Sequence, residues 1–83
     1  MHFEGALVER WRSGETVVLR LLVDGQVRGV QLRPVEDNLL DVCLPDLYRG
    51  RFWFPSSFQG DSIRATVNNR VVEIVLSLKR SSA

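Results

Sequence analysis

Apolar and polar residues alternate with a period of two along most of this chain, and no other feature constrains its fold as strongly. Successive side chains of a β-strand point to opposite faces, so this alternation places one apolar set against a core. The two longest alternating segments are residues 15–23 and 71–79. Their predicted inward-facing residues are Val17, Leu19, Leu21, Val23, Val72, Ile74, Leu76 and Leu78.

The same pattern, bounded by turn residues, predicts seven strands. They cover residues 3–10, 15–23, 27–33, 39–44, 51–54, 63–68 and 71–79. Asp24-Gly25 predicts a hairpin between the second and third strands, and Pro34 predicts the end of the third because proline lacks an N–H donor. No segment has the 3.6-residue stripe of a helix, so we expect an all-β sandwich or barrel with little or no helix.

The length of 83 residues predicts a single domain. Within it we expect an N-terminal strand and lead-in over residues 1–12, the β-sandwich over residues 13–79 and a flexible tail over residues 80–83. The N-terminus has no basic region followed by an apolar stretch, and no apolar run approaches the ~20 residues that span a bilayer. We therefore expect a cytoplasmic protein with no membrane partner.

Residues suited to catalysis or metal binding are scarce. His2 is the only histidine and lies beside the N-terminus, and Cys43 is the only cysteine, which we expect to be a small half-buried residue. Asp41 and residues 36–38 lack the spacing and central glycine of a calcium loop. We predict that the chain is not an enzyme and uses no metal or other cofactor.

The basic residues also argue against nucleic acid as a partner. The formal net charge is +1, and the arginines are scattered from Arg10 to Arg80. Nucleic-acid binders concentrate basic residues on one face, so we expect a protein partner.

Four apolar residues are out of step with the predicted core. Trp53 alternates against Phe52 and Phe54, while Val18, Leu22 and Val75 stand opposite the core sets of the two longest segments. Outward positions of a sandwich are usually polar, so these four residues are the candidate partner-binding surface. Trp53 has an alternative position, packed beneath a neighbouring loop or sheet.

The order of the later segments resembles the end of an α-crystallin-type domain. That family has an apolar strand ending in proline, an Ile-x-Ala strand, an Asn-Gly-Val-Leu turn and a closing apolar strand. Residues 52–55 (Phe-Trp-Phe-Pro) and 61–74 follow this order, with Arg70 where the family has glycine. The substitution is compatible with the turn if Asn69 takes the left-handed conformation.

The resemblance covers residues 13–79 and is to a minimal form of the family. The long N-terminal arm, the swapped loop and the Ile-x-Ile tail of small heat-shock proteins are not found in this sequence. Trp11 and residues 72–79 look more like a CS domain, the type found in co-chaperones, and crystallin-like domains attached to arsenite and tail-anchor ATPases are also similar.

This resemblance implies a seven-stranded antiparallel β-sandwich with immunoglobulin-like layers. It also implies an ATP-independent, chaperone-like or co-chaperone-like module that binds a client or a larger chaperone or ATPase, as a monomer or weak dimer. Two alternatives stay open: a small SH3- or tudor-like barrel that binds peptide or nucleic acid, and a structural subunit of a larger assembly.

Overall fold

The computed structural model describes residues 6–79, which form seven strands and one short 3-10 turn. The strands are β1 (Leu7–Ser13), β2 (Thr16–Leu22), β3 (Gln31–Glu36), β4 (Leu39–Leu44), β5 (Tyr48–Trp53), β6 (Arg64–Asn68) and β7 (Val71–Ser77), and the turn η1 spans Gly60–Ser62. His2 and the predicted tail over residues 80–83 lie outside the described residues.

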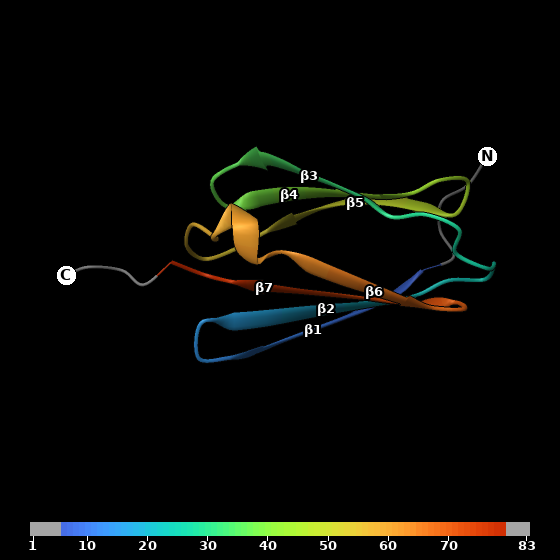
Figure 1. The fold of residues 1–83 in the computed structure, drawn as a ribbon, viewed down its shortest axis with the longest axis horizontal. Helices are drawn as coiled ribbons and strands as arrows, with labels where there is room; N and C mark the ends of the chain where they lie inside the picture. The colour runs from blue at the N-terminus through green and yellow to red at the C-terminus, as the bar shows by residue number, and fades with distance from the viewer. Residues whose placement is uncertain (1–5, 80–83) are drawn as a thin grey trace.

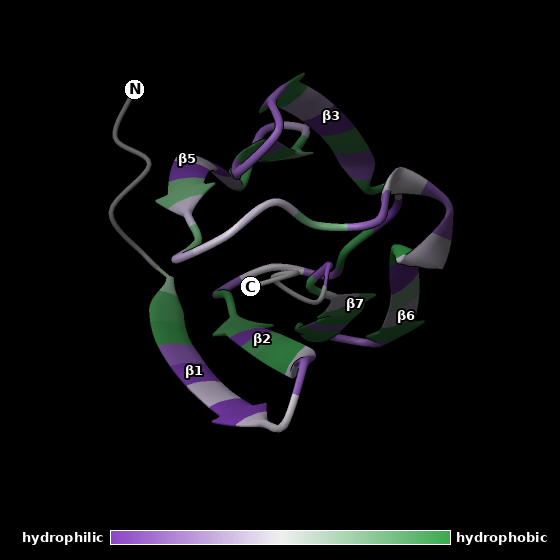
Figure 2. Ribbon diagram, turned by 90° about the vertical axis from the view of Figure 1, so that its left-hand side faces the viewer, coloured by the Kyte–Doolittle hydropathy of each residue, from purple (hydrophilic) through white to green (hydrophobic). Residues whose placement is uncertain are grey.

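The strands build two antiparallel sheets, in the orders β1-β2-β7-β6 and β3-β4-β5. Figure 1 shows the sheets as two stacked layers. The prediction of a seven-stranded antiparallel β-sandwich is therefore confirmed. Figure 2, which looks along the strands, shows that β1 and β5 lie at one side of the sandwich and β6 and β3 at the other.

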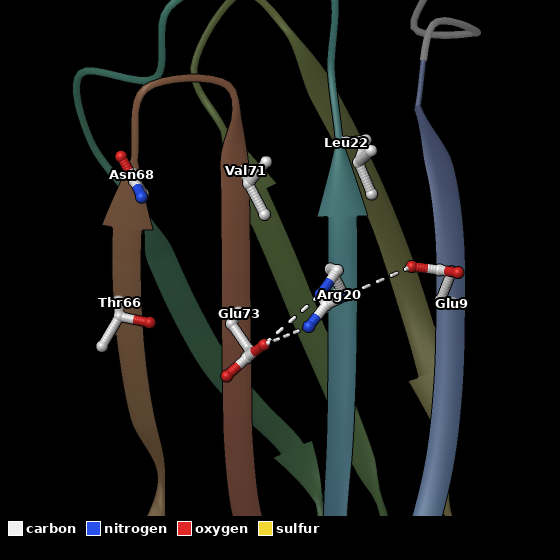
Figure 3. A pocket seen from close by; sticks show the side chains of 7 residues that line it. All are labelled: Glu9, Arg20, Leu22, Thr66, Asn68, Val71 and Glu73. Carbon is white, nitrogen blue, oxygen red and sulfur yellow. Dashed lines mark hydrogen bonds and ion pairs between the residues drawn. The ribbon is translucent and has the colours of Figure 1, made fainter.

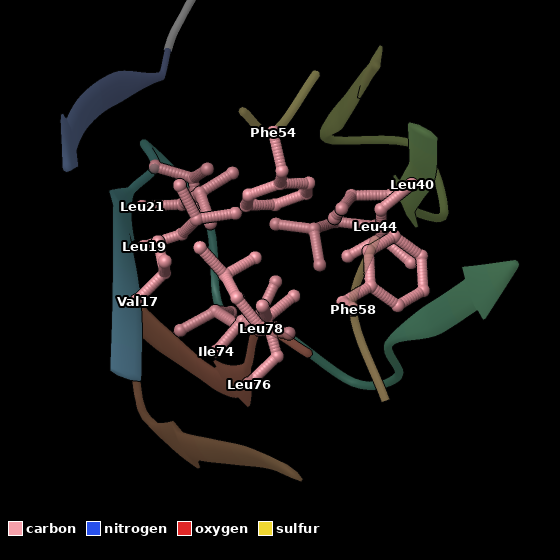
Figure 4. Close-up of a cluster of buried hydrophobic side chains, with 14 residues drawn as sticks. Val17, Leu19, Leu21, Leu40, Leu44, Phe54, Phe58, Ile74, Leu76 and Leu78 are labelled. Atoms are coloured by element: carbon pink, nitrogen blue, oxygen red, sulfur yellow. The ribbon is translucent and has the colours of Figure 1, made fainter. Parts of the chain in front are cut away.

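A single apolar core fills the space between the sheets. Figure 4 shows its side chains reaching toward one another from both layers. The alternation predicted this core on the central strands, since Leu19 of β2, Leu40 of β4 and Ile74 of β7 are all 0% exposed. Phe54 and Phe58 meet edge to face at 5.6 Å between ring centroids, a favourable aromatic geometry.

The predicted hairpin at Asp24-Gly25 is wrong. Residues 23–30 form no strand, because β2 and β3 belong to different sheets and this segment connects the two layers. The Val23 and Val27 amides donate to the carbonyls of Arg70 and Asn69, at 3.0 and 2.9 Å, and both valines are 7% exposed. Burial against the β6–β7 turn thus overrides the local turn propensity of Asp24-Gly25.

The predicted end of the third strand at Pro34 is also wrong, because β3 begins at Gln31 and continues to Glu36. β3 is an edge strand whose pairing with β4 shifts register between Pro34 and Glu36. An edge strand tolerates proline because one side of its backbone needs no partner.

Two smaller expectations agree with the structure. Asn69 has a φ of 60°, so it takes the left-handed conformation that the turn before β7 requires. Cys43 is half-buried, as expected for a small filling residue. None of the helical structure between residues 6 and 79 has the length or apolar character that crossing a membrane would require.

Candidate protein-interaction surface

The outer face of the four-stranded sheet carries an apolar row that crosses three strands. In register, Trp11 of β1 pairs with Val18 of β2, and Val18 pairs with Val75 of β7. Directly opposed residues on one face have Cβ atoms about 4.5–5.5 Å apart, so the three side chains are neighbours. Trp11 is 43% exposed and the two valines are half-buried. We call these three residues the apolar row.

A polar row lies beside it and links three strands by ion pairs. Arg20 of β2 contacts Glu73 of β7 at 3.1 Å and Glu9 of β1 at 3.7 Å. All three side chains are substantially exposed, so these pairs add little to stability. The Arg20 guanidinium also lies 5.1 Å from the Trp11 ring centroid, within cation–π range. The polar row therefore borders the apolar row, and Arg20 contacts the Trp11 ring.

A second apolar group and an open hollow lie on the side of the polar row away from the apolar row. Leu7, Leu22 and Val71 occupy one register row, and Leu7 is 62% exposed. A hollow of about 410 Å³ extends from Leu22 and Val71 over the polar row to β6. Figure 3 shows its lining side chains projecting from the same face of the sheet, with Arg20 between the two glutamates.

The structure brings three of the four predicted contact residues onto this face. Val18 and Val75 are direct cross-strand partners, and Leu22 lies on the far side of the polar row. Trp53 is not with them, because β5 belongs to the other sheet. It is 56% exposed on the outer face of that sheet, so the alternative of a Trp53 packed beneath a loop or sheet is wrong.

Trp11 is the residue that sequence reasoning left out of the candidate surface. The predicted first strand ended at Arg10, whereas β1 runs through Trp11 to Ser13. The missed signal is the spacing of Leu7, Glu9 and Trp11 at every second position, which places Trp11 on the same outer face as Glu9. β1 extends this far because its full length pairs with β2.

Arg10, the neighbour of Trp11, connects the two layers at the β1–β5 side. Its Nη2 atom donates to the Trp53 carbonyl oxygen at 2.7 Å, and its guanidinium lies 4.6 Å from the Phe54 ring centroid. Since Arg10 points toward the other sheet, Trp11 must point away from it. The inward Arg10 therefore fixes the outward orientation of the tryptophan.

Comparison with known proteins leaves the family open: no protein-family model and no curated protein matches this chain.

Proposed function

We propose that this chain is a protein-binding domain that acts without ATP or a metal, as a chaperone-like or co-chaperone-like module. The observation that supports this most is the apolar row of Trp11, Val18 and Val75 on an outer sheet face. In most sandwiches the outer face is polar, and an apolar group bordered by polar residues is typical of a protein contact surface. Tryptophan is also among the residues that dominate binding energy at such surfaces.

The charges around the row favour protein over nucleic acid on this face. Arg20 lies between Glu9 and Glu73, so the polar row has one positive and two negative side chains. Phosphates would be repelled by this arrangement, because nucleic-acid affinity depends on uncompensated basic residues. A partner with exposed apolar side chains fits the row, and its polar groups would meet the ion pairs at the rim.

The resemblance to minimal α-crystallin and CS domains supports the same proposal. A chaperone-like module binds clients through their exposed apolar side chains, and the apolar row supplies a complementary surface. The alternative of an SH3-like barrel fits less well, because the described strands form two separate sheets and not one closed sheet.

The test is the suppression of aggregation of chemically reduced insulin, followed by light scattering. We expect the wild-type chain to slow aggregation, and the double variant Trp11→Ser/Val18→Thr to need at least tenfold more protein for the same effect. Loss of a central tryptophan contact typically costs about 2 kcal/mol or more, which corresponds to such a factor.

The matched control is Val35→Thr, which makes the same valine substitution at a 39% exposed position of the other sheet. It should suppress aggregation as well as the wild type, and circular dichroism should show that both variants remain folded. Equal activity of the two variants, or no suppression by the wild type, would rule out the proposal.

A further inference from the structure

The outer face of the three-stranded sheet has a different character from the surface described above. In register, Arg33 of β3 pairs with Asp41 of β4, and Asp41 pairs with Arg51 of β5. In the adjacent row, Arg49 of β5 pairs with Cys43 of β4. Arg33, Arg49 and Arg51 are all exposed, and we call them the arginine face.

The positive charge of the arginine face is poorly compensated. Arg49 contacts Asp41 at 3.5 Å, which is the long end of an ion pair, and its side chain is 62% exposed. Among residues 6–79, Arg33 and Arg51 form neither an ion pair nor a hydrogen bond through their side chains. The two rows thus hold three guanidinium groups against one carboxylate, and the next row adds the exposed Glu36 opposite Leu39, whereas Arg20 lies between two glutamates that both pair with it.

Asp41 contributes a second, independent feature. Its side chain is 7% exposed, and its Oδ1 atom is buried without a hydrogen-bond donor from any described residue. Asp41 lines a hollow of about 160 Å³ together with Gln31, Arg33, Cys43 and Arg49. A buried acceptor without a donor is costly and rare in native proteins, so a donor supplied by a ligand would be strongly favoured here.

We propose that the arginine face binds an extended acidic segment of another protein. Guanidinium groups pair with carboxylates through two parallel hydrogen bonds, which makes arginine suited to acidic side chains. Arg49 and Arg51 are two residues apart on β5, a separation of about 6.6–6.8 Å along a strand. Alternate side chains of an extended segment have the same spacing, so carboxylates at every second position would match both arginines.

An extended peptide also accounts for Asp41. Its backbone N–H groups are hydrogen-bond donors, and one of them over the hollow would approach the Asp41 carboxylate, reaching the buried Oδ1 atom only after the side chains that line the hollow move. A nucleic acid fits less well, because its affinity depends on many phosphate contacts, more than the three arginines of this face provide.

This inference extends the proposed function, a protein-binding domain, to a second face. The two surfaces lie on opposite outer faces of the sandwich, so each can be disrupted alone. Failure of one proposal therefore leaves the other open to its own test.

The test is titration of the ¹⁵N-labelled chain with a ten-residue peptide of alternating Asp and Thr, followed by amide chemical shifts. We expect saturable shifts in β3, β4 and β5. Arg33→Gln and Arg51→Gln should each weaken binding about two- to fivefold, as expected for exposed ion pairs, and the double variant should weaken it about tenfold. The controls are Arg70→Gln, at an exposed turn position, and Trp11→Ser/Val18→Thr, which should both bind like the wild type.

Three results would overturn the inference. The first is equal binding of a peptide with Asn in place of Asp, and the second is unchanged affinity in the Arg33→Gln/Arg51→Gln variant. The third is tighter binding of a ten-nucleotide oligothymidine than of the acidic peptide, which would assign the arginine face to nucleic acid.

Discussion

Replacing Trp53 by alanine should destabilise the domain although this side chain is on the surface. Trp53 is 56% exposed, which leaves 44% of its surface (100 − 56) buried. A tryptophan presents roughly 250 Å² in an extended chain, so roughly 110 Å² is removed from water on folding. At about 25 cal/mol per Å², reduced for a compact unfolded state, this burial contributes about 2 kcal/mol.

The neighbour that gives this burial its importance is Leu39. It is the direct cross-strand partner of Trp53 on the outer face of β4, yet it is only 3% exposed. Truncating Trp53 would uncover this leucine, so buried apolar area would be lost on both β5 and β4. For a domain of this size, a change of 2 kcal/mol lowers the melting temperature by about 8–16 °C.

The assay is urea unfolding followed by far-ultraviolet circular dichroism, which does not depend on tryptophan fluorescence. Trp53→Phe is the matched control and should lose about half as much free energy of unfolding, since a phenyl ring still covers part of Leu39. A loss below about 0.5 kcal/mol for Trp53→Ala, as at ordinary surface positions, would refute the argument that this ring covers Leu39.

Two further predictions concern the core and the behaviour at high pH. Leu40→Ala should lower the free energy of unfolding by about 2–5 kcal/mol, because Leu40 is 0% exposed. Leu7→Ala, at a 62% exposed position, should lower it by less than about 1 kcal/mol. Similar losses for the two variants in urea unfolding would contradict the position of the core. Burial raises the pKa of the Tyr48 phenol above its ordinary value of 10.0, because desolvation disfavours the phenolate. The stability that the neutral phenol contributes is therefore complete below pH 10 and is lost as the pH rises through the folded-state pKa. Tyr48→Phe should flatten the fall in melting temperature above pH 10. An unchanged pH profile of the melting temperature would refute this.

Period-two alternation was sufficient to predict the core of the central strands. In β2, β4 and β7 the apolar set has a covering sheet above it and a neighbouring strand on each side, so pattern and burial agree. At the edges the pattern is less informative. Val67 alternates as an inward residue but is 46% exposed, because β6 has a partner on one side only.

For the candidate surfaces too, alternation predicted one property of the residues and the tertiary structure decided another. Alternation alone separated Val18, Leu22, Val75 and Trp53 from the core, because the direction of a side chain is a local property of its strand. It could not assign them to one surface, since strand pairing depends on contacts between residues distant in the sequence. Tertiary structure placed Trp53 on the opposite sheet and brought Trp11 beside Val18.

The arginine face shows what only the tertiary structure decided. In the sequence, Arg33, Arg49 and Arg51 belong to a scattered set of basic residues with a net charge of +1. The register of β3, β4 and β5 places these three around Asp41, because strands far apart along the chain become neighbours in a sheet. Sequence thus determined which side of each strand faces the core, through local backbone geometry, and the pairing of the strands determined which exposed side chains act together.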